Sequence, residues 1–452
     1  MNSLPKDFIE YIKTSRKDDA DDLLESLNNT SVTSIRIHPE KGIHDFKQTE
    51  RVPWASNGFY INERPSFTLD PLFHAGSYYV QEASSMFLEQ FFLQHVNVNQ
   101  PLVVLDLCAA PGGKSTHILS LISGESLLIA NDVVKTRAHI LSENIQKWGS
   151  ANAIVTNSPV EAFSKMRSMV DVVIIDAPCS GEGMFRKDIN ARNEWSIAHV
   201  KACSMRQKKI IQEVWPCLKE EGILIYSTCT LNEFENEQNI EWLKENFPVT
   251  PLTLSIPAQW NVEEVNHNDV YAYRLLPHKV RGEGFFIAAF KRCEANTLSK
   301  NFNRKNKIPS HQKSMTTDVS NLVNTEEHFL YFYQDSIFML PETLRPEAME
   351  VMSNAYVIHA GLHVCEVKKK NIIPSHSLAL SPLYVLNSFP DLELDKESAI
   401  AYLSRKDFFL VDVPDGIYRA TYKGVGLGWL KKIQNRYNNY YPSEWRIRIQ
   451  TE

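Results

Sequence analysis

The sequence of 452 residues contains no uninterrupted apolar run near the length of about 18 residues that suggests a membrane-spanning helix. Its first stretch, MNSLPKDFIEYIKTSRKDD, is charged throughout and lacks the apolar core of a secretory signal. From these two absences we expect a cytoplasmic protein that does not associate with a membrane.

Cysteine is scarce, with seven residues, and no two of them form a CxxC pair. An odd number without such pairs disfavours a disulfide framework and a structural zinc site, so we expect free thiols and no metal. A net charge of −6 likewise argues against a strongly basic nucleic-acid coat. Residues 291–313 nevertheless hold seven Lys/Arg and one acid, and such a basic segment can mark a local contact with a polyanion.

Short apolar runs alternate with helix-like segments in the middle of the chain. The runs cover residues 101–107, 125–132, 151–157, 170–177 and 221–229. This alternation predicts an α/β fold with a doubly wound, Rossmann-like parallel sheet. Two further runs, at residues 269–277 and 282–290, come close together and predict an antiparallel pair that makes the sheet mixed.

Shifts in pattern predict four segments along the chain. They are an N-terminal α+β module (1–80), a central α/β domain (81–293), a basic linker (294–325) and a C-terminal α+β or β domain (326–452).

The stretch LDLCAAPGGKST, residues 105–116, reads as a strand, a tight turn of small residues and a helix. Small residues let a ligand approach the backbone, and the helix N-terminus offers free N–H groups. A Walker A loop requires glycine where Cys108 stands, and a dinucleotide fingerprint requires more glycines than Gly112 and Gly113. S-adenosylmethionine remains, and Asp132, after the second strand, is suited to its ribose hydroxyls.

Two cysteines stand at predicted strand ends, Cys179 after the fourth strand and Cys229 after the fifth. Carboxyl ends of neighbouring parallel strands share one crevice, so both thiols are expected beside the methyl donor. A thiolate that adds to carbon 6 of cytosine makes carbon 5 nucleophilic, a carboxyl group at N3 stabilises the charge, and a base then removes the carbon-5 proton. The pattern therefore predicts methylation of cytosine at carbon 5.

The chain resembles the RNA cytosine-5 methyltransferases of the Sun type (NSUN), most closely the bacterial RsmF-like branch. The stretches that carry the resemblance are YYVQEASS, LDLCAAPGGKST, DAPCSGEGMFRKD, YSTCTLNEFENE, GEGFF, GLGW and NNYYPSEW. The resemblance implies a class I methyltransferase fold with a flanking N-terminal module and C-terminal RNA-binding domains.

The same resemblance implies roles for individual residues. Cys229 is the nucleophile, Cys179 assists product release, and Asp176 binds the cytosine edge near N3 and lies close to the cofactor. The cofactor loop consists of Cys108, Ala109, Ala110, Pro111, Gly112, Gly113 and Lys114, with Asp132 on the ribose.

One position departs from the family pattern, which usually has an acid after the third strand, near the adenine. Here Asn157 and Ser158 follow that strand, and we expect Asn157 to hydrogen-bond the adenine amine.

The segment after Cys179 carries three cations that are predicted to hold RNA phosphates: Arg186, Lys187 and Arg192. Phe185 and Trp195 in the same segment are candidates for stacking on an extruded base, but core packing is the favoured prediction for both.

These observations predict a monomeric methyltransferase that acts on ribosomal RNA, specifically the 16S RNA of the small ribosomal subunit. A transfer-RNA cytosine-5 methyltransferase is the first alternative, because the basic segments do not discriminate between RNAs. An RNA-binding ribosome-assembly factor with an idle site is the second, although intact cysteines count against it. A DNA cytosine methyltransferase is weaker, since those enzymes use the Pro-Cys thiol and generally lack the second one.

Overall fold

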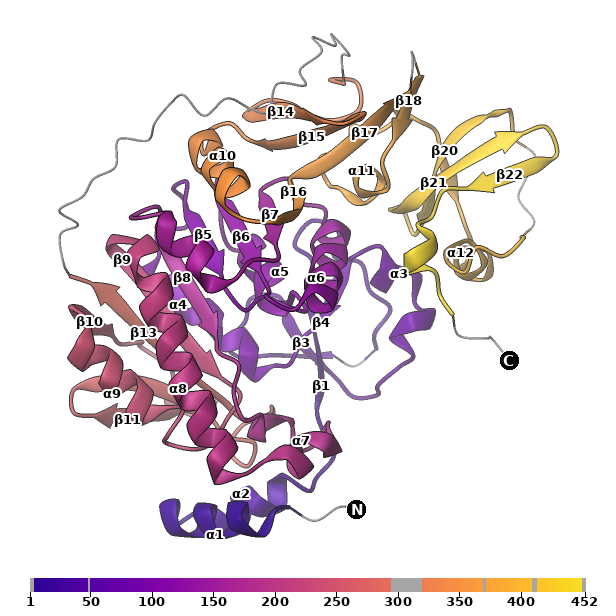
Figure 1. Cartoon of the computed structure of the whole chain (residues 1–452). Coiled ribbons are helices and arrows are strands. Elements are labelled where there is room, and N and C mark those ends of the chain that lie inside the picture. The colour runs from indigo at the N-terminus through magenta and orange to yellow at the C-terminus, as the bar shows by residue number, and fades with distance from the viewer. Residues whose placement is uncertain (1–3, 48, 294–318, 369–370, 409–412, 449–452) are drawn as a thin grey trace.

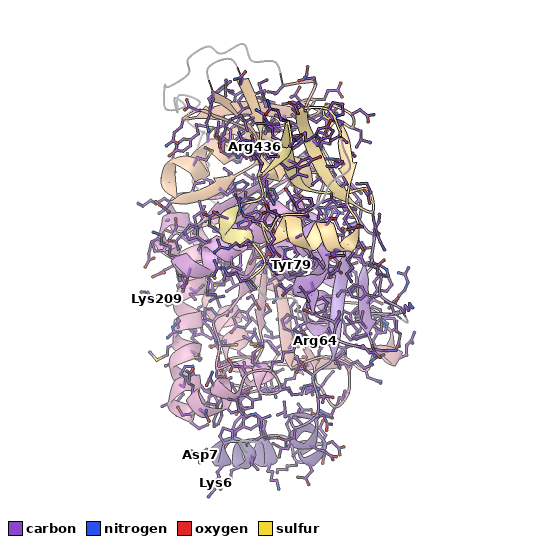
Figure 2. All side chains as sticks on the ribbon, turned by 90° about the vertical axis from the view of Figure 1, so that its right-hand side faces the viewer. Lys6, Asp7, Arg64, Tyr79, Lys209 and Arg436 are labelled. Atoms are coloured by element: carbon purple, nitrogen blue, oxygen red, sulfur yellow. The ribbon has the colours of Figure 1, made fainter. Side chains whose placement is uncertain are left out.

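The computed structural model describes five stretches of the chain: residues 4–47, 49–293, 319–368, 371–408 and 413–448. Within them the strands form four sheets, and the largest occupies the middle of the molecule (Figure 1). The N-terminal helices lie at one end and the C-terminal sheets at the other. In Figure 2, Lys6 and Asp7 accordingly lie far from Arg436.

The central sheet has ten strands, in the order β11-β12-β13-β9-β8-β5-β6-β7-β16, with β10 paired to β13. The five predicted apolar runs form its parallel strands: β5 (Val103–Asp106), β6 (Leu127–Asn131), β7 (Ala153–Thr156), β8 (Val170–Asp176) and β9 (Leu218–Thr228). Antiparallel strands complete the sheet: β10 (Val249–Leu252), β11 (Glu263–His267), β12 (Val270–Leu275), β13 (Phe285–Arg292) and β16 (Val357–Ala360). The predicted mixed α/β sheet is confirmed.

Helices cover both faces of this sheet, because its strands are apolar on both sides. Along β5, Val103 and Leu105 belong to one core cluster and Val104 to the other, as the alternation of side chains in a strand requires. The helices α8 (Ile197–Val214), α9 (Glu237–Asn246) and α10 (Arg345–Asn354) contribute to the first cluster. The second cluster includes side chains of α4 (Leu88–His95), α5 (Gly113–Leu119) and α6 (Lys135–Trp148).

The N-terminal module combines a small sheet with two helices that pack elsewhere. Its strands have the order β2-β3-β1-β4: β1 (Thr33–Ile37), β2 (Thr49–Arg51), β3 (Gly58–Ile61) and β4 (Tyr78–Val80), with α3 (Pro71–His74) before β4. The helices α1 (Lys6–Ser15) and α2 (Ala20–Ser26) instead share a core cluster with Phe185 and Trp195, on either side of α7 (Ile189–Glu194). The first helices are thereby anchored on the central domain.

Two four-stranded sheets make up most of the C-terminal region. One contains β14 (His328–Tyr333), β15 (Ser336–Pro341), β17 (Leu362–Lys368) and β18 (Asn371–Pro374). The other contains β19 (Asp391–Glu393), β20 (Gly416–Tyr422), β21 (Val425–Ile433) and β22 (Arg436–Asn439). The helices of this region after α10 are α11 (His376–Leu380) and α12 (Lys396–Leu403).

The C-terminal region also extends the central sheet, since β16 pairs antiparallel with β7 (Val357 opposite Thr156). A boundary at residue 326 therefore does not separate the sheets, and the proposed domain limits stay a prediction. Most of the predicted linker, 294–318, lies outside the described residues, while its last portion buries Val319, Leu322 and Val323. No helix in the described stretches is long and apolar enough to cross a membrane.

Candidate active site

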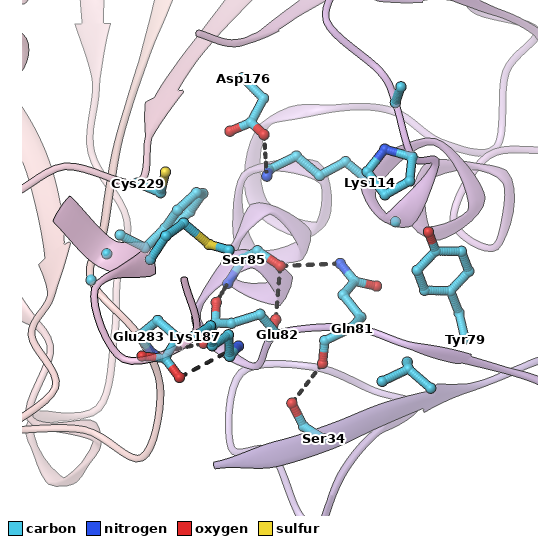
Figure 3. A pocket seen from close by; sticks show the side chains of 18 of the residues that line it. Ser34, Tyr79, Gln81, Glu82, Ser85, Lys114, Asp176, Lys187, Cys229 and Glu283 are labelled. Carbon is cyan, nitrogen blue, oxygen red and sulfur yellow. Dashed lines mark hydrogen bonds and ion pairs between the residues drawn. The ribbon is translucent and has the colours of Figure 1, made fainter. Parts of the chain in front are cut away.

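A cavity of about 460 Å³ opens where β5, β8 and β9 end (Figure 3). Carboxyl ends of parallel strands converge there, which is the usual ligand position in an open α/β sheet. The wall from the central domain includes Asp106, Cys108, Lys114, Asp176 and Cys229. The opposite wall comes from the N-terminal module and the segment that follows it, and includes Ser34, Tyr79, Gln81, Glu82 and Ser85.

The two predicted thiols meet at this edge, with Cys179 Sγ 3.2 Å from Cys229 Sγ. The loops that carry them are also joined by their backbones, because Gly183 N–H donates to the Cys229 carbonyl at 2.6 Å. Cys229 lines the cavity, whereas Cys179 is not among its lining residues. The hydrogen bond with Cys229, together with burial, raises the pKa of Cys179 well above its usual value, so this thiol keeps its proton at neutral pH.

Asp176 ends β8 and presents its carboxyl group to the cavity beside a half-buried cation, Lys114. Lys114 Nζ lies 2.8 Å from Asp176 Oδ2, and the Ser227 hydroxyl donates to Oδ1 at 2.8 Å. Burial acts to lower the pKa of Lys114, but the adjacent Asp176 outweighs it and the pKa is raised. The pair thus places a carboxyl group and a protonated amine in direct contact at the cavity, the dashed line in Figure 3.

The predicted cofactor loop forms the cavity floor between β5 and α5. Cys108, Ala109, Ala110, Pro111, Gly113 and Lys114 line the cavity, and Gly112 does not. Gly112 instead makes the turn into α5, with φ +114°, a left-handed conformation that glycine adopts readily. The predicted loop residues are therefore brought together at one place.

Asp106, at the end of β5, has an unusual environment that the sequence did not reveal. Its Oδ2 accepts a hydrogen bond from the Ser115 hydroxyl at 2.6 Å. Its Oδ1 is buried in the cavity wall and has no hydrogen-bond partner among the described residues. Burial raises the pKa of Asp106 to about 7, in spite of the bond from Ser115. A cationic ligand group could supply the missing partner.

Asp132 and Asn157 follow the next two strands, β6 and β7, beyond the lining of the cavity. Asp132 is 3% exposed and accepts a hydrogen bond from Val134 N–H at 2.9 Å, while Arg137 Nη2 lies 3.2 Å from its Oδ2. Arg137 also donates to the Ala110 carbonyl at 2.8 Å. Asn157 donates through Nδ2 to the Asp132 carbonyl at 2.7 Å, so the residues form one continuous edge with the cofactor loop.

Arg36 of β1 couples the N-terminal wall to the cofactor helix. Its guanidinium is buried and donates to Gln81 Oε1 at 2.8 Å, Thr116 Oγ1 at 2.6 Å and Ser120 Oγ at 3.0 Å. Burial lowers the pKa of Arg36 to about 9, yet it stays protonated at neutral pH. One buried cation therefore fixes α5 and the cavity-lining Gln81 relative to each other.

Three family models match successive regions of the chain. The model described as 16S rRNA methyltransferase RsmB/F matches residues 93–291. The model of the N-terminal domain of 16S rRNA methyltransferase RsmF matches residues 4–83, and that of the RsmF PUA domain matches residues 389–447. The chain is therefore similar to the RsmB/F methyltransferases in three separate regions. This confirms the family resemblance, the enzyme class and the S-adenosylmethionine cofactor inferred from the sequence motifs.

Individual relatives match over nearly the whole chain. Ribosomal RNA small subunit methyltransferase F of Shewanella piezotolerans is 28% identical over 97% of this chain and 93% of its own. The protein of the same name from Vibrio vulnificus is 28% identical over 98% and 97%. A solved methyltransferase homologue from Pyrococcus horikoshii is 28% identical, with a TM-score of 0.54 over 64% of this chain and 95% of its own.

Of the three cations predicted to hold RNA phosphates, one lines the cavity. Lys187 does so, with its Nζ 3.4 Å from Glu283 Oε1. Arg186 forms a buried ion pair with Glu283, at 2.5 Å, and Arg192 donates to the carbonyls of Phe185 and Leu27. Arg186 and Arg192 thus make contacts within the protein, and RNA contacts for all three stay a prediction.

Phe185 and Trp195 pack in the core, as favoured from the sequence. Phe185 is 2% exposed and Trp195 is 6% exposed. The ring centroid of Phe8 lies 5.1 Å from that of Phe185 and 5.3 Å from that of Trp195. Trp195 Nε1–H also donates to Glu182 Oε1 at 2.7 Å. These contacts attach α1 to the loop that follows Cys179.

A buried polar network behind the thiols was not predicted from the sequence, although its residues lie within the stretches that carry the family resemblance. Glu182, in the loop after Cys179, accepts hydrogen bonds from Leu231 N–H at 2.6 Å and Asn232 Nδ2 at 2.8 Å. Glu235 accepts another from Asn232 Nδ2 at 2.9 Å. The only signal in the sequence was the density of acids and amides in GEGMF and LNEFENE, which also suits an exposed loop.

Proposed function

We propose that this protein transfers a methyl group from S-adenosylmethionine to carbon 5 of a cytosine in 16S ribosomal RNA. The observation that carries the proposal is the pair of thiols 3.2 Å apart beside a cavity that also contains the Asp176 carboxylate. The names of the relatives, ribosomal RNA small subunit methyltransferase F, support ribosomal RNA rather than transfer RNA as the substrate.

The residues of the cavity floor fit the cofactor. When bound, S-adenosylmethionine supplies a methyl group on a positively charged sulfur. Asp106 Oδ1, buried and unpartnered within the described structure, is suited to accept a hydrogen bond from its ammonium group. The small residues from Cys108 to Gly113 let the cofactor approach the backbone, and we assign Asp132 to its ribose and Asn157 to its adenine.

We assign a separate chemical role to each side chain around the thiols. Cys229, which lines the cavity, adds through sulfur to carbon 6, and the electron pair displaced to carbon 5 takes up the methyl group. We assign the Asp176 carboxyl group to N3, where it shares a proton with the ring nitrogen as the adduct forms and takes it back on release, and Lys114 keeps the side chain in place. A base then removes the carbon-5 proton, the double bond re-forms, and the Cys229 thiolate leaves; we assign assistance in this release to Cys179.

Cysteine variants test the proposal with purified small ribosomal subunits and with 16S RNA as substrates. Cys229→Ala should abolish methyl transfer, because no adduct can form. Cys179→Ala should accumulate a covalent protein–RNA species that migrates slowly in a denaturing gel. Cys203→Ala, a buried cysteine on α8, is the control and should retain activity. Full activity of Cys229→Ala, or no slow species with Cys179→Ala, would contradict the assignment.

We further propose that the protein acts as a monomer in the cytoplasm, where its RNA substrate is found, and without a metal. The described residues contain no cluster of three or more His, Cys, Asp or Glu side chains arranged to hold a metal ion. Sedimentation of the purified protein tests the first point, and retention of activity after treatment with a chelator tests the last.

A further inference from the structure

The two cysteines are held by different buried side chains that are adjacent in the sequence. Glu235 and Asn236, in the stretch after Cys229, are both 0% exposed. Neither lines the cavity, so neither is placed to touch the substrate. Each nevertheless makes hydrogen bonds on both sides of one cysteine, directly or through one neighbour.

Glu235 fixes the backbone around Cys179. It accepts a hydrogen bond from the N–H of Ser180, the next residue, at 3.1 Å. It also accepts one from Gln207 Nε2 at 2.7 Å, and the same Nε2 donates to the carbonyl of Pro178, the preceding residue, at 3.1 Å. The peptide groups on both sides of Cys179 are thus tied to one carboxylate.

Gln207 is itself oriented by its surroundings, which makes this tie rigid. Its Oε1 accepts hydrogen bonds from the Tyr226 hydroxyl at 3.0 Å and from Asn239 Nδ2 at 2.6 Å. Because Oε1 has two donors, the amide nitrogen must point toward Pro178 and Glu235. The loop that carries Cys179 is therefore fixed from α8 and β9 together.

Asn236 fixes Cys229 in the same manner. Its Oδ1 accepts a hydrogen bond from the Thr228 hydroxyl at 2.6 Å, and its Nδ2 donates to the Thr230 carbonyl at 3.0 Å. Thr228 precedes Cys229 and Thr230 follows it. A single amide thus spans the nucleophile, and both of its hydrogen bonds are to the neighbours of Cys229 rather than to those of Cys179.

We propose that Glu235 and Asn236 are positioning residues with separate tasks: Glu235 holds Cys179 for release, and Asn236 holds Cys229 for attack. This inference rests on the proposed function, which gives the two thiols different steps. Misplacement of a reacting group by about 1 Å can cost on the order of a hundredfold in rate, so holding the loops matters for each step. Substitution of Glu235 should therefore impair release of the adduct, and substitution of Asn236 should impair its formation.

The experiment measures adduct formation and adduct release separately in three variants. Glu235→Gln should form the covalent protein–RNA species at close to the wild-type rate and release it about tenfold more slowly, so that the species accumulates. Asn236→Ala should form it about tenfold more slowly or not at all, without accumulation. Glu237→Gln is the control, because Glu237 lies in the same stretch, is buried and pairs with Arg274 instead.

Calorimetric titration with S-adenosylhomocysteine and thermal melts separate these effects from unfolding, since all variants should bind it within about twofold of wild type. If Glu235→Gln fails to fold, Gln207→Met removes the tie to Pro178 and should accumulate the adduct as well. The inference is overturned if Glu235→Gln and Asn236→Ala slow the same step, or if neither differs from the control. Absence of an adduct with Cys179→Ala would instead contradict the proposed function itself.

Discussion

The unpartnered carboxylate of Asp106 predicts that cofactor binding depends on pH in a defined way. Burial raises the pKa of Asp106 from its ordinary 3.8 to about 7 in the cofactor-free protein. Each pKa unit corresponds to about 1.4 kcal/mol, so ionising this side chain in the folded protein costs about 4 kcal/mol. Because the pKa in the folded state is raised, the cost is absent below about pH 4, where the side chain is protonated in both the folded and the unfolded protein. The stability of the folded protein therefore falls as pH rises from about 4 through 7.

The bound ammonium group of S-adenosylmethionine reverses this preference, because a cation beside Oδ1 favours the carboxylate. Binding below pH 7 should then release close to one proton. The dissociation constant should rise by up to about tenfold between pH 7 and pH 6. This window is suitable because the α-amino group itself titrates near 7.7–8.0 and stays protonated below it.

Calorimetric titration of wild type and Asp106→Asn across this window is the direct assay. The asparagine variant keeps an acceptor for the Ser115 hydroxyl, should bind the cofactor more weakly at pH 7.5, and should show no change between pH 6 and 7. Its cofactor-free form should melt at a higher temperature than wild type at pH 8, where the buried charge is costly. Glu220→Gln, an exposed acid on β9, is the control. A wild-type affinity that does not change between pH 6 and 7 would refute the reasoning.

Three further sets of substitutions test other contacts. Gly149→Ala, at φ +84°, would bring the added Cβ within 2.7 Å of a backbone oxygen in the C-terminal region and should lower the unfolding free energy by more than about 2 kcal/mol. Gly424→Ala, where φ is +75° and the added Cβ would meet no atom within 4 Å, should lower the unfolding free energy by only about 1 kcal/mol. Denaturant titration measures both changes. Lys187→Ala should raise the KM for RNA and flatten its salt dependence, whereas Lys209→Ala on the outer face should change neither (Figure 2). Arg36→Met should lower the unfolding free energy by about 2–4 kcal/mol in chemical denaturation, because it removes charged hydrogen bonds to three partners, of which Gln81 and Thr116 are buried.

The parallel strands could be predicted because each is a short apolar run followed by a polar or small residue at the ligand edge. The register of β8 and β9 could not be predicted from burial, since both strands have apolar residues on both faces and a slip of one residue would bury them as well. The addition of β16 to β7 could not be predicted either. It joins segments about two hundred residues apart, and Val357–Ala360 alone reads as an ordinary edge strand.

The positions of site residues at strand ends could be predicted from the sequence, whereas the side chains that each of them contacts could not. Cys179 and Cys229 meet because their strands are neighbours, which topology alone suggests. Arg186 looked like a free cation for RNA, but its partner Glu283 lies 97 residues away in the sequence and is brought close by β13. Likewise, the raised pKa of Asp106 follows from complete burial, which a single Asp after an apolar run does not reveal.

The pairing of β8 with β9 explains how two distant loops form one reaction centre. Asp176 stands opposite Ser227 in the register, and the Ser227 hydroxyl donates to its carboxylate. Cys179 follows that pair by three residues on one strand and Cys229 by two on the other, so both sulfurs extend just past the sheet edge. A slip of one residue would turn Ser227 to the other face, remove its bond to Asp176 and separate the thiols. Beyond the strand ends, the backbone hydrogen bonds between β8 and β9 no longer fix the two loops. There the buried side chains of Glu235 and Asn236 hold the loops through their own hydrogen bonds.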